Sequence, residues 1–270
     1  MKRSIFNTIG YQALFDVSDA FEAIEFGIEK GFSCVELNLT SPALCPENYS
    51  HEERKKLRDY EFPILLHAPQ GLPLFSLHQP VIDGTLTRLF EIIDFGKELN
   101  AKLITIHIEA TFRVSLDGKI PYIHEILPDK YAESLKYSLE RIAEYSKNRV
   151  PVAVENTGGF RYDLSHKVLD EILSNRYLFL TWDIGHTNNL DTVKREAEEA
   201  FFLKFLNKVR NVHLHDNKGN WDEHAVIGSG SVDFQKYFNI FENIDTYFII
   251  EARPKERALQ SLKVLRTMNL

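Results

Sequence analysis

The sequence lacks the features that mark several protein classes. It has only two cysteines, Cys34 and Cys45, in 270 residues, which is too few for a disulfide framework and fits a reducing compartment. A formal net charge of −7 leaves no overall basic excess of the kind that accompanies nucleic-acid binding, although a local basic patch is compatible with that total. No apolar run is long enough to span a membrane, and residues 1–12 lose their apolar character too early for a signal peptide. We therefore expect a cytoplasmic protein without membrane segments.

The sequence also lacks a G-x-G-x-x-G motif after its first apolar run, which argues against an open, doubly wound sheet. Instead, short β-rich runs alternate with amphipathic segments of helical spacing, the first of them between a Ser18 cap and Gly31. The expected strands are residues 4–10, 32–37, 63–68, 102–108, 150–155, 177–183, 210–216 and 247–252. Such alternation implies parallel strands joined by right-handed crossovers, and eight units fit the length of one TIM barrel. We predict a single (β/α)8 barrel domain over residues 1–270.

Ionisable side chains stand at the ends of six consecutive predicted strands. They are His67, His107, Glu155, Asp183 with His186 just beyond it, His213 with His215, and Glu251. In a barrel these ends meet at one mouth, formed by the carboxyl ends of the strands and the loops that follow them. Any one of these residues alone is better explained as a helix cap or a hydrogen-bonded core residue. Together they would bury unpaired carboxylates, so we expect a divalent cation, and the mixed imidazole and carboxylate ligands suit zinc, manganese, cobalt or iron.

Two long loops, residues 109–128 and 217–232, are expected on the same face. The second contains Asp222-x-His224, which can offer two ligands to one metal from an extended segment. The Gly-rich residues 228–231 precede an expected helix and could hold an anion through backbone N–H groups. Asn156, followed by Thr-Gly-Gly, fits a turn residue, a support for the metal site or a substrate contact.

As a whole, the chain resembles the xylose isomerase-like TIM barrels, a superfamily of sugar isomerases and epimerases that also includes endonuclease IV of AP endonuclease family 2. The resemblance covers nearly the whole chain. It rests on the order and strand placement of LLHAP (65–69), ITIHIE (104–109), VENTGG (154–159), WDIGHTNN (182–189), VHLHDNKG (212–219), DEHAVIGSG (222–230) and IIEAR (249–253).

The resemblance implies a metal site. Its core ligands are Glu155, Asp183, His213 and Glu251. In the epimerase branch these hold one ion, often manganese, cobalt or magnesium, and the two glutamates are the catalytic residues that exchange protons with the substrate. The substrate contacts expected here are His186, Asn156, Arg253 and His215. In the endonuclease IV branch the same core belongs to a cluster of three zinc ions, whose additional ligands match His67, His107, His186, Asp222 and His224.

These observations leave three hypotheses. The first is a metal-dependent isomerase or epimerase of a small sugar or sugar phosphate, favoured because the expected mouth loops at residues 11–20 and 69–80 carry no Lys or Arg for DNA phosphates. The second is a three-zinc phosphodiesterase acting on abasic DNA or another phosphate ester, the only case in which nucleic acid is a partner. The third is a binding protein that retains the metal site. Phe201, Phe202 and Phe205 fit a homo-oligomer interface or, better, the core.

Overall fold

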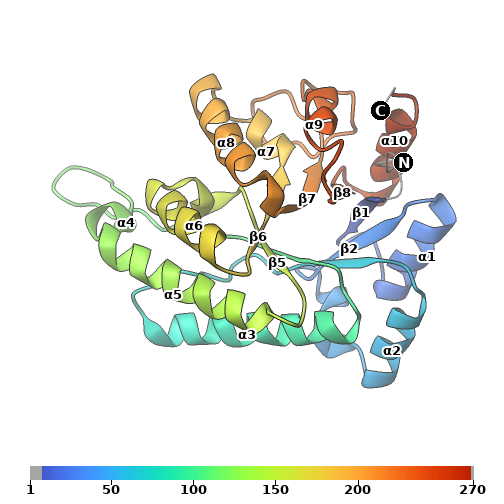
Figure 1. Ribbon diagram of the computed structural model, residues 1–270, viewed down its shortest axis with the longest axis horizontal. Coiled ribbons are helices and arrows are strands. Elements are labelled where there is room, and N and C mark those ends of the chain that lie inside the picture. The colour runs from blue at the N-terminus through green and yellow to red at the C-terminus, as the bar shows by residue number, and fades with distance from the viewer. Residues whose placement is uncertain (1–7, 269–270) are drawn as a thin grey trace.

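The computed structural model describes residues 8–268, in which eight parallel strands close into a barrel in chain order (Figure 1). The strands are β1 (Ile9–Ala13), β2 (Cys34–Asn38), β3 (Ile64–His67), β4 (Ile104–Ile106), β5 (Val152–Glu155), β6 (Phe179–Asp183), β7 (Val209–Leu214) and β8 (Tyr247–Ile250). The barrel closes where β8 pairs with β1, with Gly10 opposite Ile249. The predicted TIM barrel is confirmed, and the open sheet is excluded.

The first strand lies further along the chain than the sequence indicates. Residues 4–7 of the predicted strand fall outside the described residues, and β1 continues past Gly10 to Ala13. Gly10 faces Cys34 so closely that a Cβ there would lie 2.4 Å from the Cys34 sulfur, so glycine permits the close approach of β1 to β2 instead of ending the strand. As a result Gln12, expected in a loop, points into the barrel.

Helices surround the barrel (Figure 1). They are α1 (Ala20–Lys30), α2 (His51–Asp59), α3 (Gln79–Glu98), α4 (Ile123–Ile126), α5 (Pro128–Ser146), α6 (Asp163–Asn175), α7 (Ile184–Asn188), α8 (Thr192–Lys204), α9 (Phe234–Ile240) and α10 (Lys255–Leu265). The cap of α1 is Asp19 and not Ser18, because the Asp19 carboxylate accepts a hydrogen bond from the backbone N–H of Glu22 at 2.9 Å. The helix ends, as expected, at Gly31, whose φ of 78° is left-handed.

The core lies between the barrel and its helices. Trp182 of β6 is fully buried and stacks on Phe202 of α8 with ring centroids 4.5 Å apart. Phe205 is also buried, and Phe201 packs against the same core, as the helical spacing predicts.

The barrel interior contains a layer of buried polar side chains directly below the mouth. Thr105 of β4 and Thr181 of β6 share a hydrogen bond of 2.9 Å across the barrel. Asn211 of β7 donates to Glu36 of β2 at 3.0 Å. This layer lies directly below the residues at the ends of the strands.

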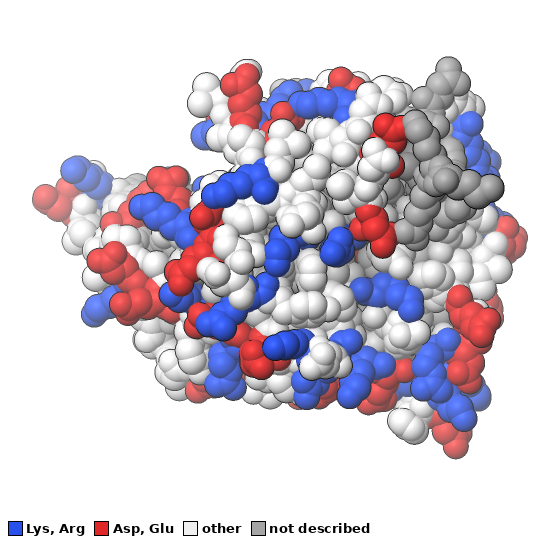
Figure 2. All heavy atoms as spheres, in the orientation of Figure 1, with Lys and Arg blue, Asp and Glu red and all other residues white. Residues whose placement is uncertain are grey.

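The two long loops are ordered. Residues 109–128 contain a narrow ribbon, with bridges between Arg113 and Tyr122 and between Leu116 and Lys119, which is followed by α4 (Figure 1). Basic and acidic side chains alternate over the face in view, without a broad basic area (Figure 2). No helix within residues 8–268 is long and apolar enough to cross a membrane.

Candidate metal centre

Glu155, at the end of β5, lies at the centre of the mouth. Its Oε2 atom is 3.1 Å from Nε2 of His67, 3.1 Å from Nε2 of His107 and 3.4 Å from Nδ1 of His213. Its Oε1 atom is 3.2 Å from Nδ1 of His186. Oε2 thus faces three histidines and Oε1 faces a fourth, so this carboxylate could contribute to more than one cation site.

The first group consists of His67, His107 and Glu155, whose ligand atoms all lie within 4.8 Å of one another. His67 ends β3, and its Nδ1–H donates to the carbonyl oxygen of Ala68 at 2.9 Å. This bond fixes the tautomer that leaves Nε2 free to face Glu155 and a cation.

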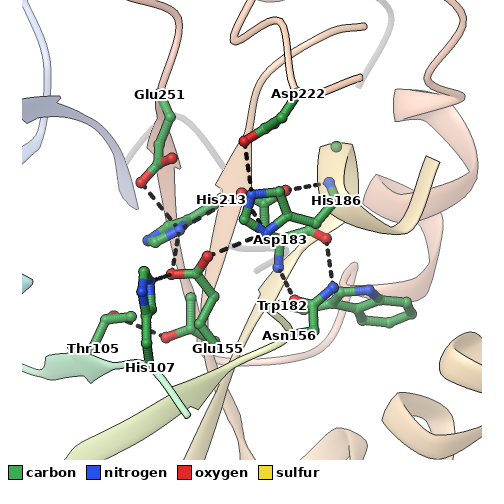
Figure 3. Close-up of polar contacts among 12 residues, drawn as sticks. Thr105, His107, Glu155, Asn156, Trp182, Asp183, His186, His213, Asp222 and Glu251 are labelled. Carbon is green, nitrogen blue, oxygen red and sulfur yellow. Dashed lines mark hydrogen bonds and ion pairs between the residues drawn. The ribbon is translucent and has the colours of Figure 1, made fainter. Parts of the chain in front are cut away.

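The second group occupies the middle of the mouth and contains Glu155, Asp183, His213 and Glu251 (Figure 3). Nδ1 of His213 is 3.1 Å from Glu251 Oε1 and 3.9 Å from Asp183 Oδ2. Asp183 serves both of the roles considered for a strand-end carboxylate. Its Oδ1 accepts from the backbone N–H of His186 at 2.7 Å and caps α7, while Oδ2 points to His213.

The third group brings the β7 loop against α7. Oδ2 of Asp222 lies 3.2 Å from Nε2 of His186 and 3.0 Å from Nε2 of His224. The Nδ1–H of His224 donates to the carbonyl oxygen of Glu251 at 3.1 Å, so its Nε2 is the free ligand atom. His224 has a φ of 45°, a left-handed conformation that non-glycine residues rarely adopt and that clusters at functional sites.

Buried ligand atoms without hydrogen-bond partners show that these groups fit cations. Within the described part of the chain, these atoms are Asp183 Oδ2, His186 Nδ1, His213 Nδ1 and His215 Nε2. Buried polar atoms are nearly always satisfied. Three of these atoms lie close together, with Asp183 Oδ2 at 3.7 Å from His186 Nδ1 and 3.9 Å from His213 Nδ1, and His215 Nε2 lies 3.3 Å from Asp222 Oδ1. Divalent ions bound by imidazole and carboxylate would satisfy them, which fits zinc, manganese or cobalt.

The charges of the site are strongly coupled. Burial by itself lowers the pKa of His213, but the carboxylates of Glu251 and Glu36 outweigh it and hold the pKa of this imidazole well above its ordinary value. The pKa of His186 is raised in the same way, chiefly by Asp183 acting against burial. Burial would raise the pKa of Glu155, yet the neighbouring imidazole of His107 holds it well below its ordinary value. Without a cation, protonated histidines therefore balance the carboxylates.

Two residues that the sequence did not single out support the second group from below. Glu36 of β2 is fully buried, and its Oε2 lies 3.1 Å from Nε2 of His213. It therefore accepts the Nε2–H and leaves Nδ1 of His213 to face the site. Gln12 of β1 donates to Glu36 at 2.9 Å and to Glu251. A carboxylate inside an otherwise apolar strand was the available signal for Glu36.

Asn156 supports Asp183 and does not line the mouth. Its amide donates to the carbonyl oxygen of Asp183 at 2.9 Å and accepts from the backbone N–H of Asp183 at 2.7 Å. The same amide donates to the buried Glu198 of α8 at 2.8 Å. Because the side chain is fully buried and each end is paired, the structure favours support over the expected substrate contact.

The other expected substrate contacts differ in exposure. Arg253 donates to Gln12 at 2.7 Å and to Glu251 at 3.2 Å, and its side chain is 36% exposed, so it pairs with a carboxylate at the rim. His186 belongs to the third group and borders the second. His215 is completely buried, beneath the exposed part of the mouth.

The Gly-rich residues 228–231 do bind an anionic group through backbone N–H groups, but the group belongs to the chain itself. Asp216 Oδ2 accepts from Gly228 at 2.9 Å and from Gly230 at 2.8 Å, and Oδ1 accepts from Val232 at 3.1 Å. The expected open anion site is therefore occupied by the Asp216 carboxylate, which fixes the loop that carries Asp222.

A cavity of about 330 Å³ opens between the loops that follow β3 and β4. Residues of the loops after β3 and β4 line it, among them Phe75, His78, Glu109 and Phe112. Its volume is that of a small-molecule pocket, although none of the nine expected ligands lines it.

Comparison with known proteins gives both branches of one superfamily. Residues 24–268 match the family model described as xylose isomerase-like TIM barrel. "Uncharacterized protein MJ1311" of Methanocaldococcus jannaschii is 29% identical over 245 residues, covering 83% of this chain and 75% of that protein. "Probable endonuclease 4" of Aquifex aeolicus is 27% identical over 238 residues, covering 78% of each. A solved "D-tagatose 3-epimerase-like protein" superposes with a TM-score of 0.76 over 96% of both chains, and its 24% identity shows the fold alone.

Proposed function

The chain belongs to the xylose isomerase-like TIM barrel family, and from this premise we propose that it is a metal-dependent enzyme that hydrolyses a phosphate ester at three adjacent cation sites. The observation that supports this proposal is the convergence of all nine expected ligands into tight groups. One ligand atom from each residue lies within 4.8 Å of the others in four sets: His67, His107 and Glu155; Glu155, Asp183 and His186; Glu36, His213 and Glu251; and His186, His215, Asp222 and His224. Glu155 joins the first set to the second, and His186 joins the second to the last. One relative of this chain is named as an enzyme that acts on phosphate esters, the probable endonuclease 4 of Aquifex aeolicus.

A single ion does not account for this convergence. Glu155 directs Oε2 at His67 and His107 and Oε1 at His186, so one cation could use only part of this set. The third group, with Asp222 between His186 and His224, is held together by different atoms. Burying so many ionisable groups is unfavourable unless each is paired, and separate cations would pair them all.

Bound in these groups, divalent ions would polarise phosphoryl oxygens and lower the pKa of a water molecule. The chain itself supplies the arrangement. His67, His213 and His224 are each held in one tautomer by a second hydrogen bond, to Ala68 O, Glu36 and Glu251 O respectively. Arg253 at the rim supplies a partly exposed cation that can contact a substrate anion.

The mouth favours a small phosphate ester over a DNA duplex. The loops at residues 14–19, 39–50 and 68–78, after β1, β2 and β3, contain no Lys or Arg. Duplex binding draws much of its affinity from cations placed on phosphates. The cavity of about 330 Å³ between the loops after β3 and β4 has the volume of a compact ligand.

A second candidate is a metal-dependent isomerase or epimerase of a sugar. The observation in its favour is that Glu155 and Glu251 approach the same Nδ1 of His213 from different strands, at 3.4 and 3.1 Å. Two carboxylates around one ion at Glu155, Asp183, His213 and Glu251 could exchange a proton with a carbon next to a carbonyl. In that reaction His67 and His107 are substrate contacts and not ligands.

Both reactions can be measured on one preparation loaded with zinc, manganese, cobalt or magnesium. Phosphate-ester hydrolysis is assayed with bis(p-nitrophenyl) phosphate and an abasic duplex, and epimerisation by solvent deuterium incorporation into ketoses and their phosphates. We expect hydrolysis that falls at least about 100-fold in His107→Ala, the loss typical of removing a group aligned for the reaction. His51→Ala, at an exposed histidine of α2, is the matched control. Deuterium incorporation without hydrolysis would overturn the proposal in favour of the second candidate.

A further inference from the structure

His215 follows β7 at the base of the mouth, two residues beyond His213, and is 0% exposed. We propose that His215 is a fourth protein ligand of the third cation site, with His186, Asp222 and His224. This inference rests on the proposed metal centre. It assigns to His215 a role different from the substrate contact that the sequence suggests.

The distances in the group are those of one coordination sphere. Nε2 of His215 is 3.3 Å from Asp222 Oδ1, and Asp222 Oδ2 is 3.2 Å from His186 Nε2 and 3.0 Å from His224 Nε2. Zinc–nitrogen bonds of about 2.0–2.1 Å in a tetrahedron separate neighbouring ligand atoms by about 3.3 Å. One ligand atom from each of the four residues lies within 4.8 Å of all the others.

The nitrogens of the His215 imidazole form no hydrogen bond of regular geometry within residues 8–268. Neither Nδ1 nor Nε2 has a hydrogen-bond partner among the described residues, although both are buried. Nε2 nevertheless lies 3.1 Å from Asp183 Oδ1 and 3.3 Å from Asp222 Oδ1. Close approach to two carboxylates without hydrogen-bond geometry is the arrangement expected of ligand atoms that surround an ion.

The absence of a side chain at Gly185 leaves room for the His215 ring. A Cβ on Gly185 would lie 2.2, 2.4 and 2.6 Å from three atoms of the His215 imidazole. On another side the ring stacks on His224, with centroids 4.1 Å apart and an interplanar angle of 26°. Gly185 and His224 thus fix the ring and shield it from substrate.

A site with four protein ligands has a different role from its neighbours. Structural zinc sites are closed by four protein ligands, whereas catalytic sites keep a position for water or substrate. The third ion would therefore hold the loop of residues 217–232 against α7. The first two groups would be left to bind the substrate.

The test is cation binding by the full-length protein, purified without a metal-affinity tag. Zinc content is measured by elemental analysis after dialysis against a series of zinc buffers, for wild type, His215→Ala, Gly185→Ala and the double variant. We expect the weakest equivalent to be lost from each single variant, with affinity lowered more than the 10- to 100-fold typical of outer-sphere changes. The double variant should bind no more weakly than His215→Ala, because the methyl group then has no ring to displace.

Gly84→Ala is the matched control, because a Cβ at Gly84 meets no atom within 4 Å. Should His215→Ala fail to fold by circular dichroism, Gly185→Ala, which keeps the imidazole, decides the question. Cobalt substitution provides a readout in the wild type, and the third equivalent should show the intense absorption of tetrahedral cobalt.

Full wild-type affinity in both single variants, or a weak absorption of six-coordinate cobalt, would overturn the inference and leave the proposed function intact. Additive losses in the double variant would show that Gly185 does not act through His215. A wild type that binds a single ion would instead contradict the proposed function itself.

Discussion

Replacing Glu36 with glutamine tests how the second group of ligands is held. All the groups that contact the Glu36 carboxylate in this network are hydrogen-bond donors. Gln12 donates at 2.9 Å, Asn211 at 3.0 Å and the Nε2–H of His213 at 3.1 Å. A glutamine has one acceptor oxygen, so its NH2 group would face at least one of these donors inside a fully buried site. His213 would then lose the carboxylate that fixes its tautomer.

The expected magnitude follows from the bonds that are lost. Hydrogen bonds to a charged group contribute about 1.5–3 kcal/mol each, and changes in the partner of a ligating histidine typically weaken metal binding about 10- to 100-fold. That range corresponds to about 1.4–2.8 kcal/mol, so the two estimates agree. We expect the zinc dissociation constant of the second site to rise by this factor in Glu36→Gln.

The assay is a zinc titration in competition with a chromophoric chelator. Glu25→Gln is the control, because Glu25 makes the same kind of side-chain bond at the surface, to the Tyr60 hydroxyl at 2.9 Å. Wild-type zinc affinity in a folded Glu36→Gln protein would refute the view that Glu36 prepares His213 to bind a cation.

Three further predictions concern the surroundings of the site. Glu198→Gln should lower the free energy of unfolding by about 1.5–3 kcal/mol in urea melts, because the buried Glu198 carboxylate accepts a hydrogen bond from Asn156 at 2.8 Å. An unchanged midpoint of unfolding would contradict the view that Glu198 supports Asp183 through Asn156. Asp216→Asn should speed proteolytic cleavage within residues 217–232, because an asparagine amide can accept fewer hydrogen bonds than the carboxylate from backbone N–H groups such as that of Gly230. A wild-type cleavage rate would contradict this prediction. Zinc binding near pH 7 should release protons, and zinc affinity should increase with pH above the ordinary histidine range, because the pKa of His213 is raised. Calorimetry in buffers of different ionisation enthalpy measures the proton release, and its absence would contradict the prediction.

Much of the fold could be predicted because β-rich runs and helical spacing alternate without interruption. The same pattern located the ligand candidates, since the carboxyl ends of parallel strands meet at one face. The predictions are wrong where one residue type can serve two structural purposes. The sequence predicts that a strand ends at Gly10, yet in the structure Gly10 lies within β1 and allows this strand to approach Cys34. The backbone N–H groups around Gly228 were expected to bind an external anion, yet Asp216 occupies them.

The supporting residues could not be predicted because they depend on contacts across the barrel. Glu36 of β2 meets His213 of β7, and these strands are not neighbours in the sheet. Alternation along a strand placed His213 and His215 on the same side, but β7 ends at Leu214. The His213 ring therefore reaches Glu251 while the His215 ring reaches Asp222. Only the three-dimensional course of the chain separates these two positions.

The proposed function requires three cation sites side by side at the mouth of this barrel. The most direct test is the metal content per chain, measured by elemental analysis on protein purified without chelator and without a metal-affinity tag. We expect close to three divalent ions per chain, one for each of the three groups of ligands at the mouth. A single ion per chain, unchanged after zinc, manganese or cobalt is added, would contradict it.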